Sequence, residues 1–121
     1  MNKFSISLFV LVFILGSSYS FSQTHIQSGT FILNTETEGY SLNKLTGDRS
    51  VIKEITFDKP FDKKPKVVIS VTSLDSDTKT NIRYRIEAIS ISRDGFTVKL
   101  STWSDSKIFA LNGNWIAYIE E

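Results

Sequence analysis

The chain has 121 residues, with 14 basic and 13 acidic side chains and no cysteine. This length corresponds to one small domain, and a formal net charge of +1 without a basic stripe argues against a nucleic-acid partner. The lack of cysteine excludes disulfides and a thiol nucleophile, so stability has to come from packing or from assembly.

The N-terminus has the pattern of a secretory signal peptide. Lys3 precedes an almost wholly apolar run at residues 4–16, and the small residues Ser20 and Ser22 precede a cleavage point after Ser22. We predict a signal peptide at residues 1–22 and a mature domain at residues 23–121. The protein is then secreted, or periplasmic or on the cell surface in a bacterium. The alternative, an N-terminal membrane anchor, is disfavoured because the run is too short to span a bilayer, and we expect no membrane insertion of the mature form.

The mature chain shows apolar alternation in short segments and no sustained helical period. We expect six strands, around residues 25–34, 51–57, 67–71, 82–91, 96–103 and 115–119. A polar loop at residues 35–48 separates the first strand from the second, and one at residues 75–81 separates the third from the fourth. A phase shift of the apolar positions predicts a bulge near Ala88, and Asp94-Gly95 predicts a tight hairpin turn with positive φ. Hairpin-type spacing favours an all-β fold, an antiparallel β-sandwich.

Trp103 is the most informative single residue. Phe96, Val98 and Leu100 alternate with polar residues, so Trp103 falls on the polar face at the point where this strand ends. A flat aromatic beside hydroxyls and a carboxylate suits sugar binding, because it offers an apolar surface to sugar C–H groups. If a hairpin joins the fourth and fifth strands, Arg83 lies at the same sheet end. The alternative is an ordinary contact in which Arg83 covers an exposed ring.

Enzyme chemistry finds little support. His25, the one histidine, lies near the mature N-terminus and is more typical of a surface residue than of a general base. Two carboxylates can hydrolyse glycosides, but the candidate acids Asp75, Asp77 and Asp105 lie in polar loops that would not raise a pKa. Asp75-Ser76-Asp77 lacks the glycine and closing glutamate of a calcium loop and is better explained as a solvated turn. We therefore expect no catalytic residue, no metal and no cofactor.

Motifs along nearly the whole mature chain resemble the H-type lectin domains, a family that includes a snail agglutinin and the C-terminal domains of discoidins. The motifs are Gln27-Ser28-Gly29, Ile55-Thr56-Phe57, Pro60-Phe61, Pro65-Lys66-Val67-Val68, Ser70, Leu74-Asp75, Arg83, Gly95-Phe96, Thr102-Trp103 and Trp115-Ile116. The resemblance implies a six-stranded antiparallel β-sandwich that assembles as a trimer, in some members a hexamer. It also implies non-enzymatic binding of galactose or N-acetylgalactosamine near a subunit boundary.

The resemblance also implies site residues. Arg83 and Trp103 match the family arginine and tryptophan, and Asp48 is the best match for the aspartate, with Asp105 as a supporting acid. Ser104 stands where the snail lectin has a histidine, and Phe109 replaces an aromatic hydroxyl. Family cysteines that tie the first strand to the fifth are matched by Leu33 and Leu100, which we expect to be a buried apolar pair on paired strands.

Three functions follow from the sequence, in decreasing order of support. The first is a secreted lectin for galactose-type sugars, with a site at Asp48, Arg83, Trp103, Ser104 and Phe109, in which Arg83 pairs with Asp48. The second is a trimeric adhesion or structural domain that has lost sugar binding, which the changes at Ser104 and Phe109 favour. The third is a small glycosidase. A glycan array with Arg83→Ala as control separates the first two.

Overall fold

The computed structural model describes residues 25–44 and 46–120, and these form two antiparallel sheets packed face to face. This described part contains six strands and no helix, so none that could cross a membrane. The predicted signal peptide, residues 1–22, lies outside it. The strands are β1 (Ile26–Asn34), β2 (Arg49–Thr56), β3 (Lys66–Ser76), β4 (Arg85–Ile89), β5 (Gly95–Thr102) and β6 (Ile108–Tyr118). The six-stranded antiparallel β-sandwich expected from the sequence is confirmed.

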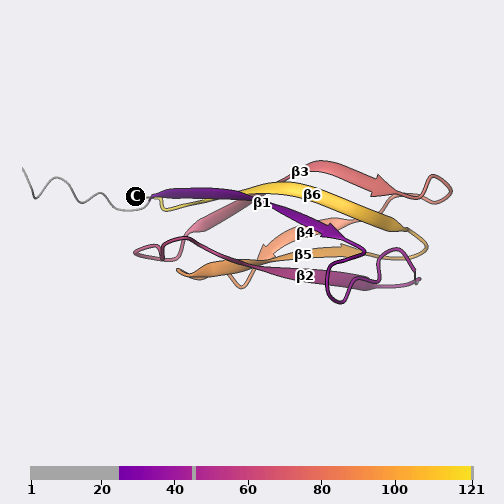
Figure 1. Ribbon diagram of the computed structural model, residues 1–121, viewed down its shortest axis with the longest axis horizontal. Coiled ribbons are helices and arrows are strands. Elements are labelled where there is room, and N and C mark those ends of the chain that lie inside the picture. Colours follow the sequence, from indigo (N-terminus) through magenta and orange to yellow (C-terminus); the bar gives the residue numbers. More distant parts are fainter. Residues whose placement is uncertain (1–24, 45, 121) are drawn as a thin grey trace, which may run out of the picture.

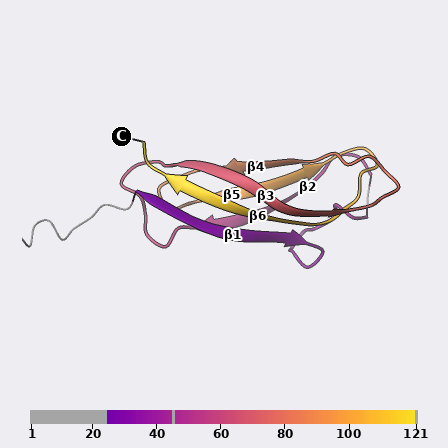
Figure 2. The ribbon, with the colours of Figure 1, turned by 90° about the horizontal axis from the view of Figure 1, so that it is seen from above.

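One sheet has the strand order β1-β6-β3 and the other β2-β5-β4. In Figures 1 and 2 the two sheets form an elongated sandwich, with β6 and β5 as the central strands of their layers. Burial alternates residue by residue along β5 and along most of β6, as the pleat of a strand with one face in the core requires. The outer faces of both sheets remain open to solvent in the single chain.

The core between the sheets is aliphatic at one end and aromatic at the other. Phe57, Phe61, Phe96 and Trp115 form the aromatic part, with Phe57 and Phe61 edge to face at a centroid distance of 4.9 Å. The aliphatic part is built around Leu33, Val98, Leu100, Ile108 and Leu111, all fully buried. Each such side chain contributes about 1.5–3 kcal/mol through its burial, so core packing stabilises a domain that has no cysteine.

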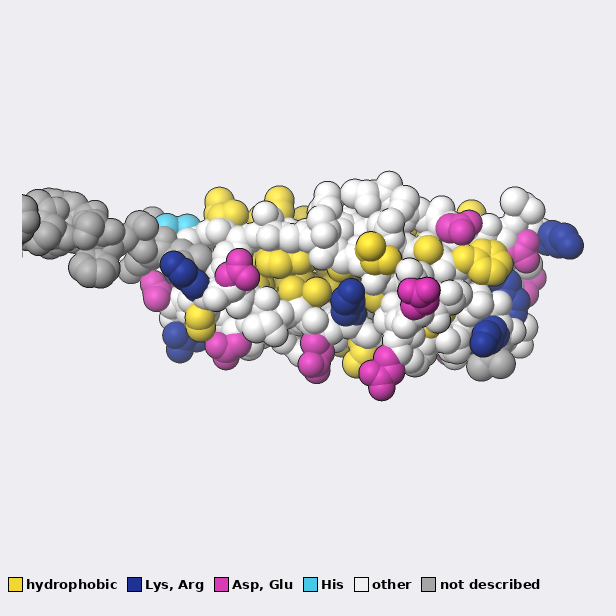
Figure 3. All heavy atoms as spheres, viewed as in Figure 1, with side chains coloured by type: hydrophobic (Ala, Val, Ile, Leu, Met, Phe, Trp, Pro, Cys, Tyr) yellow, Lys and Arg dark blue, Asp and Glu magenta, His cyan; other side chains and the backbone are white. Residues whose placement is uncertain are grey.

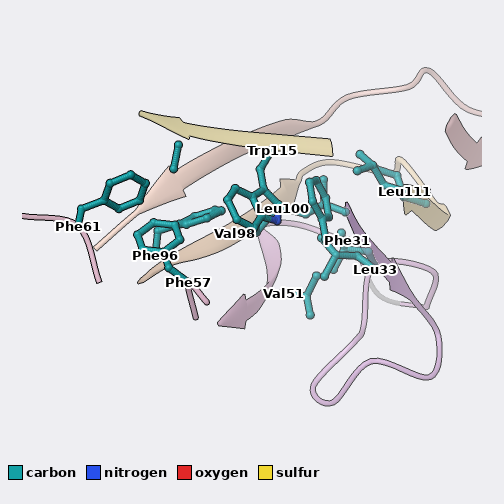
Figure 4. Packing of buried hydrophobic residues seen from close by; sticks show 13 residues of the cluster. Phe31, Leu33, Val51, Phe57, Phe61, Phe96, Val98, Leu100, Leu111 and Trp115 are labelled. Carbon is teal, nitrogen blue, oxygen red and sulfur yellow. The ribbon is translucent and has the colours of Figure 1, made fainter. Parts of the chain in front are cut away.

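Leu33 and Leu100 are buried as predicted, but the predicted pairing of their strands is wrong. Leu33 lies on β1 opposite Leu111 of β6, and Leu100 lies on β5 opposite Val51 of β2. The two leucines therefore belong to different sheets and share only the core cluster between them (Figure 4). Both side chains are 0% exposed. Sequence alternation identifies the inward face of a strand but says nothing about which strand lies beside it.

The strand β6 begins seven residues earlier than the sequence predicted, at Ile108 rather than at Trp115. Asn112-Gly113-Asn114 has the composition of a turn, yet it lies in the middle of the central strand. Glycine is needed there because a Cβ at Gly113 would come within 2.6 Å of the carbonyl oxygen of Ser70 and would overlap the ring of Phe31. The third strand is also longer, since it continues through Asp75 and Ser76.

Two predictions around β4 are wrong. The pairing of β4 with β5 runs from Arg85 to Ile89 without a register shift, so the bulge near Ala88 is absent from it, and the strand ends before Ser90, which has a φ of 53°. Gly95 does not occupy a positive-φ turn either. It begins β5, where a Cβ would overlap the carbonyl oxygen of Ile55, so close strand contact explains this glycine.

Candidate functional site

Three loops meet at the end of the sandwich opposite the start of β1 and the end of β6 (Figure 1). They are the β1–β2 loop (35–48), the β3–β4 loop (77–84) and the β5–β6 loop (103–107). Backbone hydrogen bonds join them: Gly47 N donates to Ser104 O at 2.9 Å, and Asp77 N donates to Lys107 O at 3.0 Å. The loops therefore form one connected surface.

Arg49 is the side chain that holds two of these loops together. It is only 7% exposed, and its guanidinium donates to the carbonyl oxygens of Gly47, Leu42, Ser104 and Ser106 at 2.9–3.2 Å. An arginine suits this position because its planar fork presents five donors in a fixed geometry. No sequence pattern marks this role, because an arginine at the start of a strand resembles any exposed polar residue.

The Arg49 contacts explain an unusual backbone at Ser104. This residue has a φ of 58°, a left-handed conformation that costs a non-glycine residue about 1–2 kcal/mol. Its carbonyl oxygen accepts hydrogen bonds from both Arg49 and the Gly47 amide, which compensate for the strain. Ser104 directly follows Trp103, so the hydrogen bonds from the buried Arg49 hold the backbone next to Trp103 in one conformation.

Trp103 and Asp48 line one shallow hollow of about 440 Å³ on the outer face of the β2-β5-β4 sheet, and we refer to it as the Trp103 hollow. Its lining residues are Asp48, Arg49, Ser50, Arg85, Lys99, Ser101, Thr102 and Trp103. The indole is 39% exposed and lies beside polar and charged groups, so its apolar surface is accessible to a ligand. The hollow offers an aromatic surface, hydroxyl groups and charges of both signs, the combination that binds a polar ring.

Arg83 does not form the predicted ion pair with Asp48 within the protomer. Its Nη1 donates to Asp105 Oδ1 at 2.8 Å and to Ser106 Oγ at 3.2 Å, so Asp105 has the place expected for Asp48. The Thr102 hydroxyl donates to the Arg83 carbonyl oxygen, which keeps this segment beside the end of β5. Asp105 is the better partner because it lies in the loop that the Arg83 backbone already contacts through Ser106. The carboxylate is 60% exposed, so the pair contributes little to stability.

Phe109 lies on β6 in the opposite sheet and is not among the residues lining the Trp103 hollow. The pairing of β3 with β6 is irregular at Phe109, because its neighbours Ile108 and Ala110 pair with two consecutive residues of β3. The Phe109 ring is 40% exposed. Within one protomer the structure therefore joins Asp48 with Trp103, and Arg83 with Asp105 and Ser106, but leaves Phe109 apart. Arg85 and Lys99 line the hollow without having been singled out, although their alternation on polar strand faces was visible in the sequence.

Among the described residues, no group of three or more acidic or histidine side chains could hold a metal ion. His25 lies at the start of β1, at the sandwich end away from the three loops. The pKa of the Tyr40 phenol is raised to about 12. Burial is the larger cause, and the negative charge of Asp75 is the second. The phenol donates to the Ile108 carbonyl oxygen at 2.6 Å and so joins the β1–β2 loop to β6.

We expect the stability of the domain to fall between pH 10 and pH 12 through ionisation of Tyr40. The pKa is about 10 in the unfolded chain and about 12 in the fold, so the stabilisation is complete below pH 10 and is lost as the pH rises toward 12. Urea unfolding across this range measures it. Tyr40→Phe should be less stable at neutral pH and should lose part of the alkaline decline; an unchanged decline in the variant contradicts the assignment.

The chain is thus a small β-sandwich with a polar and aromatic hollow on one sheet, next to three converging loops. A family model for the H-type lectin domain matches residues 52–118, more than half of the chain, and the chain belongs to this family of carbohydrate-binding domains. The match begins in β2 and ends with β6, so it includes Arg83, Trp103, Ser104 and Phe109 but not Asp48.

Two individual proteins are similar to the chain in sequence. The chain is 35% identical over 71 residues to the ATP synthase subunits region ORF 7 protein of Fuscovulum blasticum, and 30% identical over 78 residues to a discoidin-1 chain of Dictyostelium discoideum. These matches cover 59% and 64% of the chain, and 62% and 31% of the two relatives. The chain thus spans less than two thirds of either relative.

Solved structures show the same fold. Discoidin II from Dictyostelium discoideum superposes with a TM-score of 0.68 at 20% identity, covering 84% of this chain and 39% of discoidin II. The tailspike protein gp49 from Pseudomonas phage LKA1 gives a TM-score of 0.57 at 24% identity, covering 82% of this chain and 15% of the tailspike chain. The sandwich therefore occurs both in a slime-mould protein and in a phage tailspike.

Proposed function

We propose that this protein is a secreted, non-enzymatic lectin that binds galactose-type sugars, including N-acetylgalactosamine. The observation that carries the proposal is the exposed Trp103 indole beside Asp48 and two serine hydroxyls in one hollow. Indole faces pack against the C–H groups of a sugar ring, while carboxylate and hydroxyl groups bind its hydroxyls. Membership of the H-type lectin family supports the same function.

In this proposal the sugar occupies the Trp103 hollow, at the part of it nearest the three loops. Asp48 accepts hydrogen bonds from sugar hydroxyls, and Arg83, oriented by Asp105, donates to sugar oxygens. Ser104, directly after Trp103, contributes a smaller polar group. Phe109 lies on the opposite sheet, so it contributes an apolar contact only where a neighbouring subunit brings it to the hollow. The site has few polar groups and is open, so we expect a dissociation constant near the millimolar range, about −4 kcal/mol per site.

Substituting Trp103 tests this function. Trp103→Ala should remove detectable binding on a galactose-type glycan array, whereas Trp103→Phe should retain part of it, because a smaller ring still stacks. Ile52→Ala is the matched control: Ile52 is also apolar and 54% exposed on the same sheet face, but it lies outside the hollow. A folded wild-type protein that binds no glycan would instead support a structural or adhesion domain.

We further propose that the protein assembles as a homotrimer, or as a hexamer of two trimers, so that several weak sites act together. The outer face of the β1-β6-β3 sheet supports self-association. Its central rows carry no charge, and Ile26, Val68 and Ile116 are 48–69% exposed. Figure 3 shows uncharged side chains over much of this upper layer and charged ones along the lower layer.

Sedimentation equilibrium at micromolar concentration measures the assembly. We expect three or six times the protomer mass, since a 99-residue domain without disulfides gains stability by covering this face. Val68→Lys places a charge on the uncharged face and should lower the mass, whereas Ile52→Lys, on the other sheet, should not. A monomer at all concentrations contradicts the proposal.

A further inference from the structure

The Trp103 hollow carries two cationic side chains that binding a neutral sugar does not need. Arg85 and Lys99 both line it, and neither takes part in the two ion pairs found in the part of the chain that the structure describes, Lys66–Glu120 and Arg83–Asp105. Glu87 lies opposite Lys99 in the strand register but does not line the hollow. Two cations that form no ion pair with the Asp48 carboxylate of the same hollow offer a favourable position for an anion.

The charges are separated along the strands. Lys99 and Ser101 lie on the same face of β5, Trp103 directly follows the end of this strand, and Arg85 is the cross-strand neighbour of Ser101. Lys99 is four residues from Trp103, which corresponds to roughly 13 Å along an extended strand. Asp48 directly precedes Arg49, the partner of Thr102, so the carboxylate belongs to the Trp103 end of the hollow. The negative group and the indole are thus at one end, and Lys99 is at the other.

The third cation, Arg49, does not contribute to this position in the same way. Its guanidinium is directed inward to four backbone carbonyl oxygens. Arg85, in contrast, is exposed, and the serines at positions 50 and 101 lie beside it in one row of the sheet. An arginine with adjacent hydroxyl donors can bind a carboxylate or sulfate group through two parallel hydrogen bonds.

We propose that the hollow binds an acidic saccharide, with a neutral ring on Trp103 and Asp48 and a carboxylate or sulfate group held by Arg85 and Lys99. This inference rests on the proposed lectin function and specifies its ligand class. The hollow extends beyond one sugar ring, so the anionic group belongs to a second residue of the glycan or to a substituent. Both anion types share the required chemistry, a negative group on a sugar.

The test compares neutral and acidic ligands by titration calorimetry at low ionic strength. The probes are lactose, sialyl-lactose for the carboxylate and 6-sulfo-lactose for the sulfate. At least one acidic probe should bind about tenfold more tightly than lactose, and added salt should remove the difference. The stronger of the two probes identifies the source of the negative charge.

Variants separate this inference from the lectin function itself. Arg85→Gln and Lys99→Gln should each reduce the acidic-probe affinity to near that of lactose and leave lactose binding unchanged. Lys64→Gln is the control: it removes an equal charge from an exposed position just before β3, outside the hollow. Equal affinity of the wild-type protein for all three probes would overturn the inference while leaving the lectin function intact. If none of the probes and no galactose-type glycan binds, both are wrong.

Discussion

Replacing Arg49 by methionine should destabilise the fold by about 2–4 kcal/mol and abolish sugar binding. Hydrogen bonds from a charged donor contribute about 1.5–3 kcal/mol each, although they do not add independently. The substitution removes the hydrogen bonds that Arg49 donates to Gly47, Leu42, Ser104 and Ser106. Leu42 and Ser104 keep a second backbone donor, from Ile108 and Gly47, so part of the loop structure should survive.

Urea unfolding and glycan binding of the same variant measure the two effects. Arg93→Met is the matched control, since its Nε donates to the carbonyl oxygen of Phe61 at the other end of the sandwich and the residue is exposed. We expect about 1 kcal/mol or less for Arg93→Met and unchanged binding. Arg49→Lys keeps the charge but cannot reach four carbonyl groups from one nitrogen, so it should lose binding as well. Full binding by Arg49→Lys would show that charge alone matters.

Leu100→Ala should lower the free energy of unfolding by about 2–5 kcal/mol, because it leaves a cavity in the middle of the core. Leu100 is fully buried on the central strand β5, with Val51 and Ile86 as its cross-strand neighbours and the leucines of the other sheet facing it. A change of this size is a large fraction of the 5–15 kcal/mol that usually stabilises a domain.

Denaturant unfolding at constant protein concentration measures this effect. Ile52→Ala is the control, since Ile52 neighbours Val51 on β2 but is 54% exposed, and we expect a change within about 0.5 kcal/mol. The double variant Leu33→Ala/Leu100→Ala tests whether the two leucines interact across the sheets; a coupling of about 0.5 kcal/mol or more is expected for side chains in contact. If Leu100→Ala is as stable as the control, the core described here is wrong.

The amino-acid sequence by itself determined the number of strands and the inward faces of some of them, but not all of their bounds. Alternation of apolar and polar residues is a local property with a period of two, so the inward faces of β3 and β5, with the buried positions Val98 and Leu100, could be predicted directly. The same alternation along β5 placed Trp103 on the polar side, and the indole is indeed exposed. The family motifs then allowed the six-stranded sandwich to be predicted.

Only the tertiary structure decided which groups meet. Strand pairing is non-local, so the sequence could not show that Leu33 and Leu100 lie on different sheets, or that Gly113 is required by the close approach of Ser70. The same reason applies to the site. Arg83 pairs with Asp105 rather than with Asp48, and the buried Arg49 joins two loops more than fifty residues apart, because three loops converge at one end of the sandwich. Loop convergence depends on the packing of the two sheets, which no local pattern encodes.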